Sequence, residues 1–165
     1  MPVSQYVYFA LSSKTTTAQE ITAFLGMKPD EVTVRGSRLT EPVVRPVLHR
    51  WKIVCRDSGL RVDEQVARVL DRLRPHTQRI AELAGGLATQ DPSHTAAVLQ
   101  IVRYFHVADE DGESDPPTPP DPQPYLFGWH LDRTVLDFLA VTGAELDVDE
   151  YYMTPDPAWV RQAAS

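Results

Sequence analysis

The pattern of apolar and polar positions, together with local composition, predicts five strands in this chain. In residues 50–56, Trp51, Ile53 and Cys55 share one face while basic residues occupy the other, and residues 145–153 alternate acids with apolar side chains. Because successive side chains of a strand point to opposite faces, both segments are typical of half-exposed strands. Composition predicts three further strands, at 6–11, 32–35 and 95–107, and the last is apolar on both faces, as in a central strand.

Capping residues mark two helices at both of their ends. Thr17 followed by Glu20 forms a capping box, and Gly26 can take the left-handed conformation that stops a helix, so we expect a helix over 17–25. Asp132 is an N-cap candidate for a later helix that ends at Gly143.

A third helical region lies between these two and is interrupted by proline. Asp63 is its candidate N-cap, and apolar residues recur at helical spacing as far as Pro75. Proline in a helix interior costs about 3 kcal/mol, so we expect two helical pieces. The second piece should end at Gly85–Gly86.

The order of these elements predicts a single α+β domain over residues 1–165. Its first six elements, βαββαβ, match a ferredoxin-like core, to which a C-terminal helix and strand are added. We expect a largely antiparallel sheet with the helices on one face. The chain of 165 residues is 42% hydrophobic, enough for one core, and 154–165 is a C-terminal tail in which Trp159 and Val160 form a short helix.

Most of the net charge of −7 comes from one segment. Residues 108–124 contain six acids, six prolines and no Lys or Arg, and the remainder has 17 acids against 16 bases. This composition predicts an acidic, proline-rich flexible loop. The alternative is a docking segment for a basic or proline-reading partner.

Basic residues are concentrated between positions 35 and 56, where Glu41 is the only acid. Such a stretch is either a solvated sheet face or a surface for phosphate or an acidic partner. No nucleic-acid module accompanies it, and Trp51 is its only aromatic residue, so nucleic acid is not an expected partner. Its basic residues are Arg35, Arg38, Arg45, His49, Arg50, Lys52 and Arg56.

Asp147 and Asp149 lie two residues apart on one face of the last predicted strand. Carboxylates spaced by about 6–7 Å along a strand can bind Mg²⁺ or Ca²⁺, or act as an acid and a base. The sequence suggests no further ligands. The simpler interpretation is cross-strand pairing with a basic strand that carries Arg50, Lys52 or Arg56.

Tyr104 and His106 project from one face of the predicted central strand, and they either line a pocket in which the imidazole transfers protons or pack at the strand end.

The sequence contains no motif of a metal or cofactor site. The five histidines lack the spacing of zinc ligands, and Cys55 is expected to be a buried thiol of the core. Glycine-rich phosphate loops, dinucleotide fingerprints and Gly-x-Ser-x-Gly elbows do not occur. We expect no metal and no cofactor.

A cytoplasmic protein is the simplest expectation for localisation. The single cysteine cannot form an internal disulfide, no signal-like start precedes Tyr6, and no run of 18 apolar residues could span a membrane.

Several segments together resemble the bacterial family called domain of unknown function 4279. They are the aromatic opening strand, LGMKPDEVTVRG at 25–36, the Trp51 strand, VDEQVARVLDRLRPHTQRIAEL at 62–83 and LDFLAVTGAELDVDEYY at 136–152. The family has no established catalytic residues to transfer, so the resemblance implies an architecture and a bacterial setting. From this setting and the small size of the domain we expect an immunity-type or partner-binding protein.

Two functional hypotheses follow, and the sequence favours binding over catalysis. The first is a non-catalytic domain that recognises another protein, with a homodimer as a further option because an open sheet leaves edges to protect. The alternative is a ligand-binding domain or enzyme with a pocket around Tyr104, His106, Asp147 and Asp149. The candidate partner or ligand surface comprises Arg35, Arg38, Arg50, Lys52, Arg56, Tyr104, His106, Asp147 and Asp149.

Overall fold

The computed structural model describes residues 3–37, 45–106 and 127–153. The acidic loop at 108–124, the tail at 154–165 with its expected helix, and Arg38 lie outside the described residues. The elements are β1 Val3–Ser13, α1 Ala18–Leu25, β2 Glu31–Thr33, β3 His49–Cys55, α2 Val62–Leu73, a 3₁₀ turn Arg74–His76, α3 Thr77–Gln90, β4 Ala97–His106, α4 Arg133–Thr142 and β5 Glu145–Met153.

The five strands form one sheet in the order β2-β3-β1-β4-β5. All neighbouring pairs are antiparallel except β4 and β5, which are parallel. A parallel pair needs a crossover connection, and α4 lies between β4 and β5 in the chain. The fold is therefore α+β with a mostly antiparallel sheet, as the sequence predicts.

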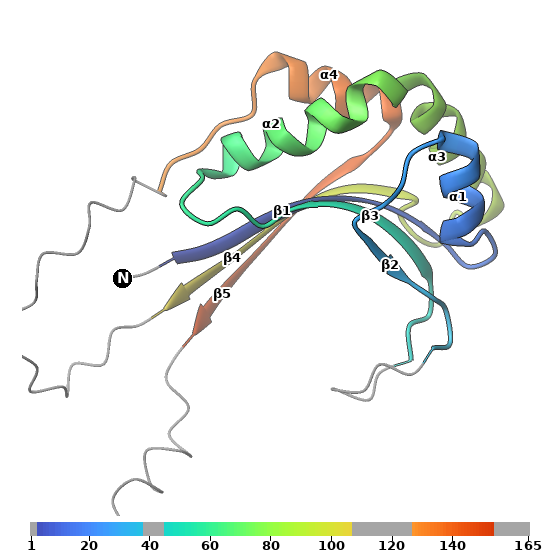
Figure 1. Ribbon diagram of the computed structural model, residues 1–165, viewed down its shortest axis with the longest axis horizontal. Helices are drawn as coiled ribbons and strands as arrows, with labels where there is room; N and C mark the ends of the chain where they lie inside the picture. Colours follow the sequence, from blue (N-terminus) through green and yellow to red (C-terminus); the bar gives the residue numbers. More distant parts are fainter. Residues whose placement is uncertain (1–2, 38–44, 107–126, 154–165) are drawn as a thin grey trace, which may run out of the picture.

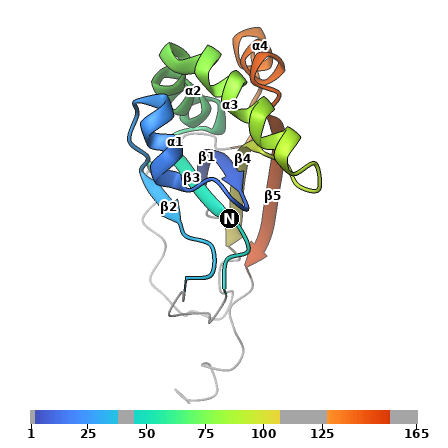
Figure 2. The same cartoon turned by 90° about the vertical axis from the view of Figure 1, so that its right-hand side faces the viewer.

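The helices cover one face of the sheet and leave the other uncovered. Figure 1 shows the strands arching beneath the helices, and Figure 2 shows the same two layers from the side. The covered face carries the apolar core, to which β1 contributes Phe9 and Leu11, and β3 contributes Trp51 and Ile53, all fully buried. Cys55 belongs to this core, which confirms that its thiol is buried.

Local capping fixes α1 and α4 as predicted. Thr17 Oγ1 accepts a hydrogen bond from the backbone N–H of Glu20, whose carboxylate accepts one from Thr17 N, and the helix ends at Gly26 with φ of 68°. Asp132 accepts from the backbone N–H of Val135, and α4 ends at Gly143 with φ of 66°.

The structure corrects both expected ends of the interrupted helix and confirms its break. Arg61, not Asp63, is the N-cap, because the Glu64 carboxylate accepts a hydrogen bond from the Arg61 backbone N–H at 2.7 Å. The 3₁₀ turn containing Pro75 separates α2 from α3. Gly85–Gly86 does not end α3, which continues to Gln90, because neither glycine adopts the positive φ of a helix stop.

None of the described helices is both long and apolar enough to span a bilayer.

Candidate functional site

The uncovered face of the sheet is polar and aromatic, and its charges are sorted by strand. Register places Arg50 and Lys52 of β3 on this face, opposite Ser12 and Ala10 of β1. On the far side, β5 places Glu145, Asp147 and Asp149 beside even-numbered positions of β4, whereas Glu150 lies beside Arg103. The strand order therefore puts a basic margin, formed by Arg50, Lys52 and Arg56, on one side of this face. An acidic margin, formed by Glu145, Asp147 and Asp149, lies on the other side.

Four tyrosines form a row between these margins. The ring of Tyr6 stacks with those of Tyr8 and Tyr104 at centroid distances of 6.1 and 6.5 Å, and Tyr104 stacks on Tyr151 at 5.2 Å. The row crosses β1, β4 and β5, and Tyr104 of β4 lies within it, stacked between Tyr6 and Tyr151.

Two of the predicted basic residues are engaged within the basic margin itself. Lys52 Nζ lies 4.3 Å from the Tyr8 ring centroid and 3.9 Å from the Glu31 carboxylate. Arg56 lies 4.1 Å from the Tyr6 ring centroid and 2.8 Å from Glu31. Burial lowers the pKa of Lys52, Glu31 opposes that shift, and the neighbouring arginines add to it. These two cations stabilise the face through aromatic and carboxylate contacts.

Arg50 differs from them, since no hydrogen bond or ion pair engages its guanidinium within the described part of the chain. The positive charge of Arg50 acts on the half-buried phenol of Tyr8. Burial raises the pKa of Tyr8, Arg50 opposes the shift, and Asp149 and Asp147 reinforce it. The Tyr8 hydroxyl thus lies within the electrostatic reach of both margins.

The expected pairing of Asp147 and Asp149 with a basic neighbouring strand is wrong. Their register partners on β4 are Gln100 and Val102, and two strands, β1 and β4, separate β5 from β3. At a spacing of about 4.8 Å per strand, the backbones of β3 and β5 are roughly 14 Å apart. Alternation identifies a strand's faces but not its neighbours.

His106 and Tyr104 share the uncovered face, as predicted from their spacing. His106 Nε2 lies 2.8 Å from Ser4 Oγ at the end of β1. Arg35 lies outside the strands: its guanidinium donates to the Lys14 carbonyl at 2.9 Å, and its backbone N–H donates to His49 Nδ1. The structure therefore places Arg35 beside His49 at the start of β3 and not within a strand of the sheet.

A groove of about 310 Å³ lies on the uncovered face and spans it from the basic to the acidic margin. Small side chains form its middle, and charged or polar side chains surround them. Of the candidates predicted from sequence, it includes Arg50 and Asp147. Its lining residues are Tyr8, Ala10, Ser12, Leu48, Arg50, His94, Thr95, Val98, Gln100, Glu145, Leu146 and Asp147.

Gln100 was missed as a site residue, although the sequence carries a signal for it. It is a polar residue within a strand that is otherwise mostly apolar, and it is only 5% exposed. Its amide nitrogen has no hydrogen-bond partner among the described residues. Buried polar groups normally have partners, so an unpaired amide in the lining of a groove is a candidate contact for a bound molecule.

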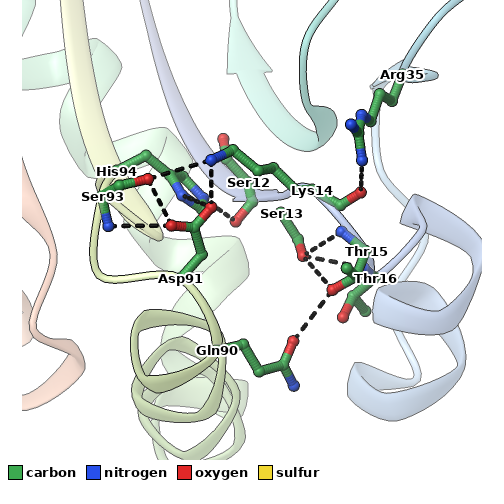
Figure 3. Close-up of polar contacts among 10 residues, drawn as sticks. All are labelled: Ser12, Ser13, Lys14, Thr15, Thr16, Arg35, Gln90, Asp91, Ser93 and His94. Atoms are coloured by element: carbon green, nitrogen blue, oxygen red, sulfur yellow. Dashed lines mark hydrogen bonds and ion pairs between the residues drawn. The ribbon is translucent and has the colours of Figure 1, made fainter.

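A network of polar contacts holds one rim of the groove, and Figure 3 shows it. The Asp91 carboxylate lies 2.7 Å from Lys14 Nζ and 3.2 Å from His94 Nδ1, and it accepts hydrogen bonds from the side chain and backbone of Ser93. The other ring nitrogen of His94 lies 3.2 Å from the Ser12 carbonyl oxygen. Contacts to Lys14 and Ser93 hold the pKa of Asp91 far below its usual range. His94 is therefore fixed in place between β1 and the loop that precedes β4.

Among the described residues, no group of three or more His, Cys, Asp or Glu side chains is arranged to hold a metal ion. The arrangement on this face provides hydrogen-bond donors, opposite charges and aromatic surface.

Comparison with known proteins identifies a family. A search of curated proteins found no match, and neither did a search of solved structures. Residues 4–153 match the family described as domain of unknown function (DUF4279), and because this covers most of the chain, the protein belongs to that family.

Proposed function

We propose that the protein is a non-catalytic binding domain that recognises a partner protein through β5 and the adjoining acidic and aromatic part of the uncovered face. An immunity-type role in a bacterium is one form of this function. We also infer that β1 to β4, with α1 to α3, form a ferredoxin-like βαββαβ core. The antiparallel order β2-β3-β1-β4 supports this inference.

The observation that carries the proposal is the exposure of β5. This strand of nine residues pairs with β4 on one side, and none of its residues is buried. Its large apolar side chains are between 38% and 66% exposed, and an exposed edge of this kind is a template for another strand. They are Leu146, Val148, Tyr151, Tyr152 and Met153.

Charge determines which partner fits. β5 carries Glu145, Asp147, Asp149 and Glu150 and no basic residue. A second copy of β5 would bring like charges together, which is unfavourable across a strand pair. A basic extended segment of another protein would instead continue the sheet through backbone hydrogen bonds and pair its charges with the carboxylates of Asp147 and Asp149, since Glu150 is already paired with Arg103 at 2.8 Å.

The test is affinity purification from the source cells with wild-type and charge-reversed baits. Asp147→Lys with Asp149→Lys should abolish recovery of a stoichiometric partner, because both carboxylates on the uncovered face of β5 become repulsive. The matched control reverses two acids on exposed helix positions, Glu82→Lys with Asp137→Lys, and should retain the partner. Circular dichroism checks that each bait is folded.

Two outcomes would contradict this proposal. One is recovery of the partner at equal yield with the β5 reversal and the helix control. The other is that wild-type bait recovers only copies of itself, with light scattering showing a dimer that the β5 reversal does not disturb.

A further inference from the structure

We propose that the groove on the uncovered face binds a short zwitterionic ligand of the dipeptide class, with its carboxylate at Arg50 and its amino group at Glu145 and Asp147. The inference does not rest on partner binding at β5. It rests on an unpaired buried amide, on the opposite charges at the two ends of the groove and on the size of the groove.

The buried amide of Gln100 requires a partner that the described residues do not provide. Its Nε2 is unpaired and the residue is 95% buried in the wall of the groove, and an unsatisfied buried donor costs about 1–3 kcal/mol. The last torsion of a glutamine side chain is soft, so the amide can turn toward a bound molecule. A peptide carbonyl oxygen between the two ends of a dipeptide is a suitable acceptor.

The two ends of the groove provide opposite charges. The Arg50 guanidinium has no partner within the described ranges, and its planar array of donors matches a carboxylate. At the other end, Asp147 makes no hydrogen bond or ion pair in the described part of the chain. Glu145 accepts one hydrogen bond, from Thr95 Oγ1 at 2.9 Å, and retains acceptor capacity for an ammonium group.

The volume of the groove fits a molecule of two residues. The backbones of β3 and β5 are roughly 14 Å apart across the sheet. Register also offsets Arg50 from Glu145 by two positions and from Asp147 by four, about 7 and 13 Å along the strands, so the two charged ends lie diagonally across the groove. A volume of about 310 Å³ accommodates such a molecule, and Ala10 and Val98 offer apolar contact to small side chains.

The groove is preorganised at the rim that carries His94. Nδ1 of this ring lies 3.2 Å from the Asp91 carboxylate and Nε2 lies 3.2 Å from the Ser12 carbonyl oxygen (Figure 3). A rim that is already ordered lowers the entropy cost of binding.

The experiment titrates the isotope-labelled full chain with L-alanyl-L-alanine and follows the backbone amide signals by NMR. We expect saturable shifts at groove residues. N-acetylation of the dipeptide removes the ammonium group and amidation removes the carboxylate, and each should weaken binding about tenfold or more, the usual effect of losing a charge-assisted contact.

Variants assign each end of the ligand. Arg50→Gln should weaken alanylalanine about tenfold and abolish discrimination against the amidated dipeptide, and Asp147→Asn should abolish discrimination against the acetylated one. Gln100→Leu should weaken all three ligands by a similar factor. The matched controls Arg133→Gln and Asp137→Asn, on exposed positions of α4, should bind as wild type.

The proposal is overturned if alanylalanine causes no saturable shift at groove residues, if the blocked dipeptides bind as tightly as the free one, or if acetate alone binds as tightly. These outcomes are distinguishable from failure at β5. Arg50→Gln tests the groove and should leave partner recovery through β5 unchanged, because Arg50 lies on β3.

Discussion

Asp30 joins three parts of the molecule through a single side chain. Its carboxylate accepts two hydrogen bonds from the Arg72 guanidinium, at 2.6 and 2.8 Å, and one from the backbone N–H of Val54 at 2.8 Å. It therefore connects the residue before β2 with α2 and β3. The hydrogen bonds from Arg72 lower the pKa of Asp30, burial opposes that shift, and the Val54 N–H adds to it.

We predict that Asp30→Asn lowers the free energy of unfolding by about 1 kcal/mol at neutral pH, a modest value because the pair is partly exposed. The folded-state pKa lies below the unfolded value, so this contribution is present above about pH 4 and is lost as the pH falls through the folded-state pKa. Urea unfolding at pH 7 and at successively lower pH measures it: the two proteins should differ at pH 7, and the difference should shrink as the pH falls below about 4. The control is Asp71→Asn, at a more exposed ion pair. An equal loss of unfolding free energy in that variant would contradict the argument that Asp30 stabilises the fold by connecting three segments.

At the scale of single elements, the sequence predicts what is determined locally. The capping box at Thr17 and the glycine stops at Gly26 and Gly143 involve contacts within a few residues, and all were predicted. The start of α2 was misplaced because Arg61 is capped by a residue three positions later and not by its own side chain. Gly85–Gly86 was misleading because glycine permits a helix stop without requiring one.

The glycine pair in α3 leads to a prediction about stability. A β-carbon at Gly85 or Gly86 meets no atom within 4 Å, and both residues have helical backbone conformations. Gly85→Ala with Gly86→Ala should therefore raise the free energy of unfolding by about 1–2 kcal/mol, and the melting temperature by roughly 3 °C for each kcal/mol. Gly143→Ala is the counterpart that should lower stability, since its φ is 66°. Thermal unfolding monitored by circular dichroism compares them, and a lower melting temperature for the double variant would contradict the argument.

The neighbours of each strand could not be predicted at this scale. Alternation around Asp147 and Asp149 identifies the exposed face of β5, but the same pattern fits an edge beside β3 or beside β4. Only the sheet order shows that two strands separate these acids from Lys52. The acids of β5 and the basic residues of β3, expected to form cross-strand ion pairs, therefore lie on opposite sides of the same face.

At the scale of the whole molecule, the groove exists only because distant segments meet. Tyr8, Arg50, Gln100 and Asp147 come from four different strands, and His94 comes from a loop. The sequence singled out Arg50 and Asp147 by their charge and spacing. It could not indicate that Tyr8 and Gln100 lie between them, because that depends on the register of β1 with β4 and of β4 with β5.

The distribution of burial across the sheet predicts how stability varies within it. β1 is hydrogen-bonded on both sides and contains Val7, Phe9 and Leu11, which are fully buried. Within the described part of the chain, β5 pairs only with β4, and it has no buried residue. Opening an edge strand exposes little apolar surface, so it should occur far more often than global unfolding. We predict that amide hydrogen exchange of β5, followed by mass spectrometry, is much faster than that of β1, whose exchange should match the rate set by the global free energy of unfolding. A β5 as protected as β1 in the isolated protein would mean that something already covers this edge, and it would remove the exposed strand on which partner recognition depends.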